Sequence, residues 1–86
     1  MLGMSGTVLI VDDDAAVRSA LKFLLELEGL DVRVYDGPIA LLAESNLPAR
    51  GCLVVDYRMP RMDGLQLIEQ LRARHVDLPV IFITDR

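Results

Sequence analysis

Two stretches decide the fold that this sequence predicts, Val8-Leu9-Ile10-Val11-Asp12-Asp13-Asp14 and Leu53-Val54-Val55-Asp56. Each is a short run of Val, Ile and Leu that ends on aspartate. Such runs are typical of strands buried on both faces, as in parallel sheets. Functional crevices of open parallel sheets lie at the carboxyl ends of the strands, so these carboxylates are expected to meet there. Like charges held close together are costly unless a cation or a proton neutralises them, and the pattern therefore predicts a divalent metal site.

Strands and helices alternate along the rest of the sequence. The expected strands are 7–11, 32–35, 52–56 and 80–84, and the expected helices are 15–28, a short one that starts at 38 and ends before 46–48, and 65–74. Asp14 can cap the first helix, and Gly29 can end it. Repeated strand–helix–strand units imply a parallel sheet with right-handed crossovers. The pattern therefore predicts an α/β, doubly wound parallel sheet.

The length and composition limit the classes of protein to which this chain can belong. Its 86 residues suffice for one small domain, expected over 7–86 behind a flexible tail at 1–6. The net charge of −4 and the lack of a basic cluster argue against direct nucleic-acid contact. No apolar run is long enough for a membrane span. Cys52 is the single cysteine, which excludes an internal disulfide and favours a cytoplasmic location.

The helix expected at 15–28 has an unusually wide apolar surface. Its apolar residues cover an arc of roughly 200°, against about 100° for an ordinary surface helix. Such a helix needs a sheet beneath it and a second element at its flank, yet the sequence offers no element for that flank. We therefore expect the chain to be a fragment whose uncovered apolar surface leads to self-association or domain swapping.

Three stretches together resemble the receiver domain of bacterial two-component response regulators. They are Val11-Asp12-Asp13-Asp14, the loop Asp56-Tyr57-Arg58-Met59-Pro60-Arg61-Met62-Asp63-Gly64, and Thr84 at the end of the last expected strand. The amino-acid sequence of residues 51–60 is similar to that of receivers in the FixJ-like group of transcription factors. The resemblance implies a flavodoxin-like sheet of order 2-1-3-4, with the family's fifth strand and last helices missing.

The resemblance also implies a role for each site residue. Asp56 would be the nucleophile that accepts a phosphoryl group from a sensor histidine kinase, making the chain a signalling phosphoacceptor and not an enzyme. Mg²⁺ would be held by the carboxylates of Asp13 and Asp56 and the backbone carbonyl of Arg58, with Asp12 acting through a water. Thr84 would hydrogen-bond the phosphoryl group, and its movement would control a DNA-binding output domain outside this sequence.

The sequence departs from the family at two positions. The family's essential lysine follows the fifth strand, whereas the single lysine of this chain, Lys22, is expected in the middle of the first helix. Asp85 follows Thr84, where receivers commonly carry a small residue. We therefore expect weak Mg²⁺ binding and poor phosphorylation.

Two other functions remain open. A phosphatase of the haloacid-dehalogenase type would use Asp12 as its nucleophile and Asp14 as its acid/base, but this interpretation leaves Asp56 and the loop that follows it unexplained. A receiver-like module that binds partners without phosphorylation is favoured by the missing lysine. A dinucleotide-binding fold is disfavoured, because the turn after the first strand contains no glycine.

Overall fold

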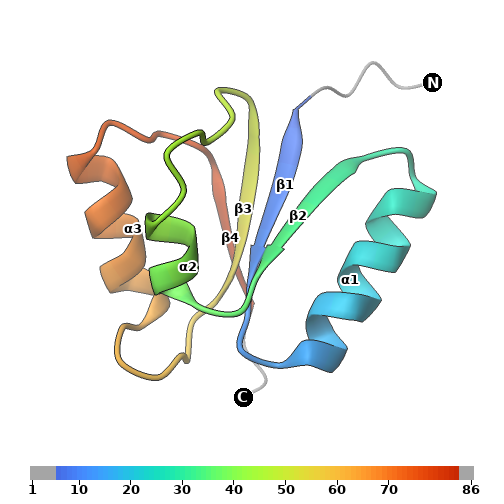
Figure 1. The fold of residues 1–86 in the computed structure, drawn as a ribbon, viewed down its shortest axis with the longest axis horizontal. Helices are drawn as coiled ribbons and strands as arrows, with labels where there is room; N and C mark the ends of the chain where they lie inside the picture. The colour runs from blue at the N-terminus through green and yellow to red at the C-terminus, as the bar shows by residue number, and fades with distance from the viewer. Residues whose placement is uncertain (1–5, 84–86) are drawn as a thin grey trace.

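Four parallel strands form one sheet in the order β2-β1-β3-β4 (Figure 1). The computed structural model describes residues 6–83. The strands are β1 (Thr7–Val11), β2 (Asp31–Tyr35), β3 (Gly51–Asp56) and β4 (Val80–Ile83). β1 is central and fully buried, which explains its uninterrupted apolar run. The expected strands and the implied strand order are confirmed.

Helices cover both faces of the sheet, as expected for a doubly wound fold (Figure 1). α1 (Ala15–Leu27) packs on β1 and β2 on one face. α2 (Pro38–Leu42) and α3 (Gly64–Ala73) lie together on the other face. α2 ends before the stop expected at 46–48, because Ala43 already closes it and the Glu44 amide turns back to the Leu41 carbonyl.

The apolar core consists of two clusters that lie on opposite faces of the sheet. Beneath α2 and α3, the strand residues Leu9 and Val55 pack against Leu67 and Leu71, all fully buried. The second cluster contains Val8, Ile10, Val32 and Val54. Neighbouring residues of a strand fall in different clusters because side chains alternate between the faces.

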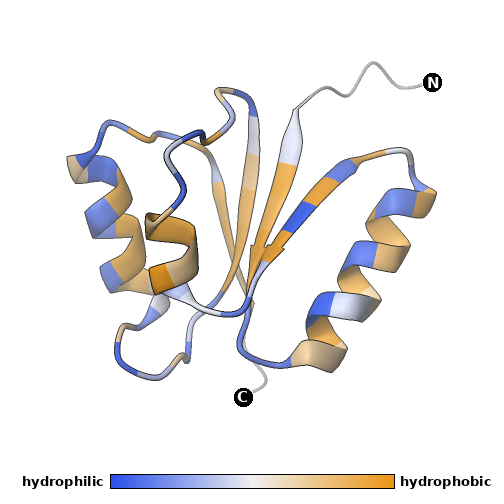
Figure 2. Cartoon of the chain, in the orientation of Figure 1, coloured by the Kyte–Doolittle hydropathy of each residue, from blue (hydrophilic) through white to orange (hydrophobic). Residues whose placement is uncertain are grey.

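α1 is the least buried of the helices. None of its residues is fully buried, and its apolar side chains at positions 23, 24 and 27 are largely exposed. Figure 2 shows how hydrophobic residues recur along this helix between hydrophilic ones. Half-buried Cys52 packs on the same face of the sheet. The expected uncovered flank of the first helix is therefore confirmed.

The first and third helices end in the same way. The Gly29 and Leu30 amides donate to the carbonyls of Glu26 and Leu25, with Gly29 at φ 86°. This is the Schellman arrangement expected from the glycine. His75 takes the corresponding position after α3 at φ 63°, and its amide donates to the Arg72 carbonyl. The single histidine thus ends a helix at the surface.

Candidate phosphoacceptor and metal site at the carboxyl edge of the sheet

Three carboxylates meet where β1 and β3 end, at the lower edge of the sheet in Figure 1. One oxygen each from Asp12, Asp13 and Asp56 lies within 4.8 Å of the other two. Because Val11 lies opposite Val55 in the parallel ladder, the residues that follow leave the sheet side by side. The predicted convergence of these acids is confirmed.

The three carboxylates differ in exposure and in their hydrogen bonds. Asp12 is 3% exposed, Asp56 is half-buried and Asp13 is exposed. The Asp14 amide donates to Asp12 Oδ1 at 2.8 Å, and the Asp12 amide donates to the Tyr35 carbonyl at 3.2 Å. Asp12 is therefore fixed in place, whereas Asp13 lies exposed to solvent at the rim of the site.

Arg18 supports the site from α1, a role that the sequence did not reveal. Its Nη1 donates to the Asp12 carbonyl at 2.8 Å. In the sequence, Arg18 is one of several polar residues on the solvent side of the first helix. A basic residue one turn into a helix that follows an acidic strand end is the signal that could have identified it.

The loop after β3 holds the carboxylate of Asp56. The Arg58 amide donates to Asp56 Oδ1 at 3.1 Å, and Oδ2 of this carboxylate has no hydrogen bond with residues 6–83. The Tyr57 amide donates to the Ile83 carbonyl at 3.0 Å and so ties this loop to β4. The structure thus places Arg58 beside Asp56 through its amide.

Gly64 lets α3 begin directly behind Asp56. A Cβ atom at this position would lie 3.1 Å from Tyr57 Cα and 3.2 Å from the Asp56 carbonyl oxygen. The sequence placed Gly64 at the end of a loop, before a helix expected over 65–74, whereas the residue already lies in the first turn of α3, where its small size allows close packing. Asp63 and Gln66 form a capping box at this helix end, and Met59 is buried in the core.

Burial and neighbouring charge raise the pKa of Asp12 above its ordinary value of 3.8. Desolvation is the largest cause, and the negative charges of Asp56, Asp13 and Asp14 act in the same direction. The hydrogen bond from the Asp14 amide lowers the pKa and only partly offsets them. A cation at this position would relieve the same repulsion, so the residues fit the donor set of a hard divalent metal such as Mg²⁺.

This raised pKa predicts how the stability of the metal-free protein depends on pH. The folded chain holds the Asp12 proton more tightly than the unfolded chain, so this contribution is fully present below the ordinary pKa of 3.8. It is lost as the pH rises through the higher pKa of the folded state. Asp12→Asn removes the titration and keeps an acceptor for the Asp14 amide.

Urea unfolding of both proteins in chelator, between about pH 4 and about pH 7, measures this difference. The free energy of unfolding of the variant should rise relative to that of the wild type as the pH increases over this range. A difference that does not change with pH would contradict the prediction.

The other acids and cations named from the sequence lie in different surroundings. Asp14 caps α1, accepting hydrogen bonds from the Ala16 and Val17 amides at 2.9 and 3.5 Å, as expected. Lys22 pairs with Glu26 at 2.6 Å on the exposed side of α1, as its position in the sequence predicted. Thr84 and Asp85 lie outside the described residues, so their expected roles stay predictions.

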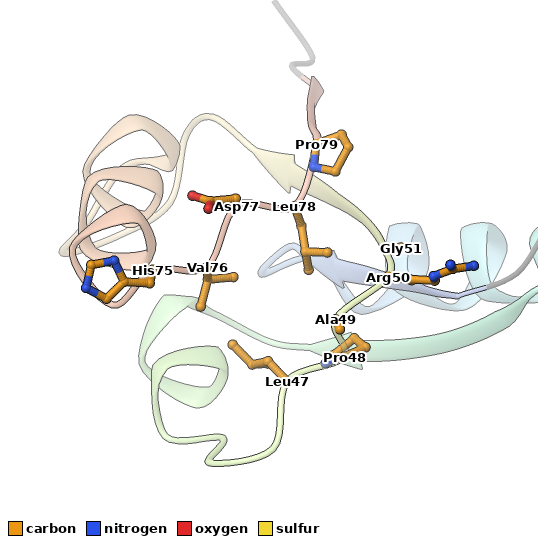
Figure 3. A pocket seen from close by; sticks show the side chains of 10 residues that line it. All are labelled: Leu47, Pro48, Ala49, Arg50, Gly51, His75, Val76, Asp77, Leu78 and Pro79. Carbon is orange, nitrogen blue, oxygen red and sulfur yellow. The ribbon is translucent and has the colours of Figure 1, made fainter.

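One cavity lies away from the acidic site. It has a volume of about 520 Å³, and residues 47–51 and 75–79, which precede β3 and β4, line it (Figure 3). It therefore opens at the amino ends of the strands, with His75 and Arg50 far apart along its wall (Figure 3). The three carboxylates have no part in it.

Within residues 6–83, no helix has the length and apolar character needed to cross a membrane.

Comparisons with known proteins agree with this geometry. The response regulator receiver domain family matches residues 8–86. The transcriptional regulatory protein FixJ of Bradyrhizobium diazoefficiens is 37% identical over 79 residues, which are 92% of this chain and 38% of that protein. The chain thus spans well under half the length of this relative.

Two solved structures share the fold. The crystal structure of FixJ-N superposes with a TM-score of 0.85 at 38% identity, covering 94% of this chain and 65% of that one. The response regulator TrrA of Thermotoga maritima superposes with a TM-score of 0.81 at 25% identity, covering 95% and 71%. The matched segment contains both strand ends that carry the acidic site. The chain belongs to the response regulator receiver domain family, whose members accept phosphoryl groups in two-component signalling.

Proposed function

We propose that Asp56 is the residue that accepts the phosphoryl group, in a Mg²⁺-dependent reaction. The observation that carries this proposal is the convergence of three carboxylates within 4.8 Å at the ends of two adjacent strands. TrrA, which shares the fold, was solved in complex with Mg²⁺ and BeF. Asp13, Asp56 and the Arg58 carbonyl would hold the metal directly, and Asp12 would hold it indirectly. When bound, Mg²⁺ supplies the positive charge that offsets the carboxylates and the phosphoryl oxygens.

Asp56 has the geometry of an oriented nucleophile. The Arg58 amide holds Oδ1, so Oδ2 is the oxygen that attacks phosphorus. The new Oδ2–P bond forms as the bond between phosphorus and the donor nitrogen or oxygen breaks. The electron pair of that bond leaves with the donor, which then takes a proton from water. The product is a mixed anhydride between the Asp56 carboxyl group and phosphate.

Asp12 and Arg18 act as positioning residues in this scheme. Asp12 is buried, and its Oδ1 is occupied by the Asp14 amide, which makes it a fixed anion behind the reacting groups. Arg18 fixes the main chain at Asp12. Neither group has to move during transfer, and a site organised in advance lowers the reorganisation that the transition state needs.

The lysine of this chain has no part in the proposed reaction. The single lysine, Lys22, is paired with Glu26 on α1, away from the carboxylates. Arg58 and Arg61 follow Asp56 in the chain and carry the nearest positive charges in sequence. Positive charge near the site helps to neutralise the transferred group during phosphoryl transfer.

The wider signalling role extends the same proposal. A sensor histidine kinase would be the physiological donor, and the cytoplasm the location. Thr84 would contact the transferred group, and a DNA-binding output domain, as in the transcriptional regulatory protein FixJ, would respond to it. The alternative function is a receiver-fold module that binds partners without being phosphorylated.

Incubation with a small phosphodonor, with and without Mg²⁺, distinguishes the two functions. Intact mass is expected to reveal addition of a single phosphoryl group that requires Mg²⁺, and peptide mapping should locate it on Asp56. A donor-free sample with Mg²⁺ is the control. If Mg²⁺ binds but no phosphoryl group is added at long times, the phosphorylation-independent module is the correct function.

A further inference from the structure

A second cavity lies at the carboxyl edge of the sheet, the edge that carries the three carboxylates. It has a volume of about 320 Å³, and residues 36–40 and 60–61 line it. These two segments follow β2 and β3, and both lie at the lower edge of the sheet in Figure 1. None of the lining residues belongs to β4 or to the ends of the chain.

The strand register places this cavity beside the acidic site. The last residues of β1 and β2 lie opposite each other, and Val55 lies opposite Val11. The residues that follow, Asp36, Asp12 and Asp56, therefore leave the sheet in one row with Asp12 in the middle. Because neighbouring strands are about 4.8 Å apart, the outer two members of the row start about 10 Å from each other. A small phosphodonor can therefore place its phosphorus at Asp56 and its other end in the cavity.

The lining of the cavity is mostly apolar. Pro38, Ile39 and Ala40 of α2 form one wall, and Pro60 of the loop after β3 adds to it. Ile39 is 56% exposed, so much of its side chain is available to a ligand. An apolar wall of this kind favours an alkyl chain over a polar group.

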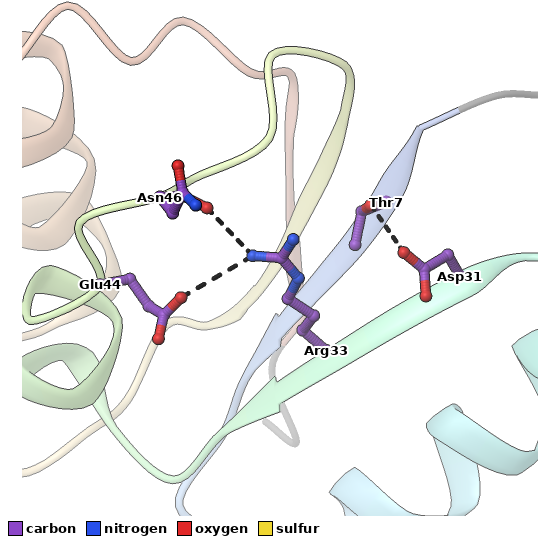
Figure 4. A network of polar contacts seen from close by, with 5 residues as sticks. All are labelled: Thr7, Asp31, Arg33, Glu44 and Asn46. Atoms are coloured by element: carbon purple, nitrogen blue, oxygen red, sulfur yellow. Dashed lines mark hydrogen bonds and ion pairs between the residues drawn. The ribbon is translucent and has the colours of Figure 1, made fainter.

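The α2 wall is held in place at the carboxyl end of the helix. Arg33 on β2 donates to the Asn46 carbonyl at 3.2 Å and lies 3.7 Å from Glu44 (Figure 4). Arg74, at the end of α3, donates to the Leu42 carbonyl at 2.8 Å. The wall is therefore formed before a ligand enters, which reduces the entropy lost on binding.

Arg61 lines the same cavity from a strained position in the loop after β3. Its φ is 74°, and the Met62 amide donates to the Pro60 carbonyl at 2.8 Å across it. So tight a turn about a residue with a side chain is costly, and strain of this kind is concentrated at ligand sites. Within residues 6–83 the Arg61 guanidinium makes no hydrogen bond or ion pair. It is therefore available to a carboxylate, which a guanidinium binds with two parallel hydrogen bonds.

We propose that this cavity binds the acyl group of a short-chain acyl phosphate, from which Asp56 takes the phosphoryl group. The inference rests on the proposed function of Asp56. The alkyl chain packs against α2 and Pro60, and the carboxyl oxygens of the acyl group face Arg61. Asp36, which also lines the cavity, repels a second carboxylate and so favours a donor derived from a monocarboxylic acid.

Arg61 stabilises the group that leaves. The bond between Asp56 Oδ2 and phosphorus forms as the bond between phosphorus and the acyl oxygen breaks. The electron pair of the broken bond stays on the acyl oxygen, and the acyl group leaves as a carboxylate that needs no proton. Because this negative charge develops only as the bond breaks, Arg61 acts more strongly on the transition state than on the bound donor.

Rates of phosphoryl uptake from three donors in Mg²⁺ test the apolar wall. The donors are acetyl phosphate, butyryl phosphate and phosphoramidate, which has no acyl group. Because each buried methylene contributes about fourfold, the second-order rate constant should be on the order of tenfold higher for butyryl than for acetyl phosphate. Ala40→Phe fills the cavity and should abolish this preference. Ala73→Phe is the matched control, since Ala73 is also an exposed helical alanine but lies outside the cavity, and it should keep the preference.

Arg61→Asn tests the contact with the leaving carboxylate. Asparagine tolerates the left-handed backbone, so the turn should be kept while the guanidinium is lost. Uptake from both acyl phosphates should fall at least about tenfold, the effect of losing a hydrogen bond to a charged group. Uptake from phosphoramidate should be the same in all variants and the wild type, which also shows that each variant is folded.

A binding measurement examines the cavity without the reaction. In 2-oxopentylphosphonate a methylene replaces the bridging oxygen of butyryl phosphate, so no phosphoryl group can be transferred. In an NMR titration with Mg²⁺, this compound should shift the methyl resonances of Ile39 and Ala40. The shift at Ile39 should be absent from the Ala40→Phe protein.

The possible outcomes separate this inference from the proposed function. Equal rates with the two acyl phosphates, equal effects of phenylalanine at Ala40 and Ala73, or no NMR shift at Ile39 would each overturn the acyl site. Uptake from phosphoramidate on Asp56 would still support the phosphoacceptor in that case. No uptake from any of the three donors would overturn both.

Discussion

Asp56→Asn is expected to reduce phosphoryl uptake from a small donor to background. An amide oxygen carries no full negative charge and is a poor nucleophile, and the substitution also removes a carboxylate from the metal site. The amide keeps an acceptor for the Arg58 amide, so the loop after β3 should hold its conformation. The measurement is the fraction of phosphorylated protein by intact mass after a fixed incubation with Mg²⁺.

Asp12→Asn separates the receiver function from the phosphatase alternative. If Asp56 accepts the phosphoryl group, loss of the Asp12 charge should slow uptake by about 10- to 100-fold, the usual effect of removing a group that supports a metal site from outside its direct ligands. The label should still map to Asp56. Label on Asp12 that persists in the Asp56→Asn protein would instead indicate the phosphatase chemistry.

A matched control exists at the other end of the sheet. Asp77 precedes β4 and lines the cavity at the amino ends of the strands. Asp77→Asn removes one negative charge from the chain, as the site variants do, but leaves the three carboxylates intact. Its uptake should equal that of the wild type, and a comparable loss would show that net charge, not the site, governs the reaction.

Gly51→Ala is expected to prevent folding. Gly51 begins β3 at φ 143°, a conformation that side chains other than hydrogen rarely adopt. A Cβ atom there would lie 1.9 Å from the Thr7 carbonyl oxygen in the adjacent strand β1. The clash is with backbone, so no side chain can move aside. We expect a loss of at least about 4 kcal/mol, comparable with the whole stability of a small domain.

Substitutions at two other glycines distinguish the steric clash from the backbone strain as causes of this loss. Gly37 has an extended backbone and no atom within 4 Å of its Cβ position, so Gly37→Ala should change stability by about 1 kcal/mol or less. Gly29 has φ 86° but open space around it, so Gly29→Ala should cost about 1 kcal/mol from backbone strain alone. Circular dichroism and urea unfolding measure all three variants. A folded Gly51→Ala protein with near-normal stability would contradict the assigned clash.

The sequence by itself determined the sheet and the position of the acids. Apolar runs that end on aspartate predict buried strands, and parallel strands end at one edge, so Asp12, Asp13 and Asp56 had to lie near one another. The roles of Asp14 and Gly29 at the start and end of the first helix could also be predicted from the sequence, because helix caps depend on residues next to them in the chain.

Only the tertiary structure decided which groups support the site and which surfaces stay open. The contact of Arg18 with the Asp12 carbonyl, and the approach of Gly64 to Asp56, depend on how α1 and α3 pack on the sheet. The same holds for Gly51, whose clash is with a strand far away in the sequence. Local sequence patterns predict whether a segment is a helix or a strand, and where it begins and ends. The distances between elements are set only when the whole sheet and its helices pack together.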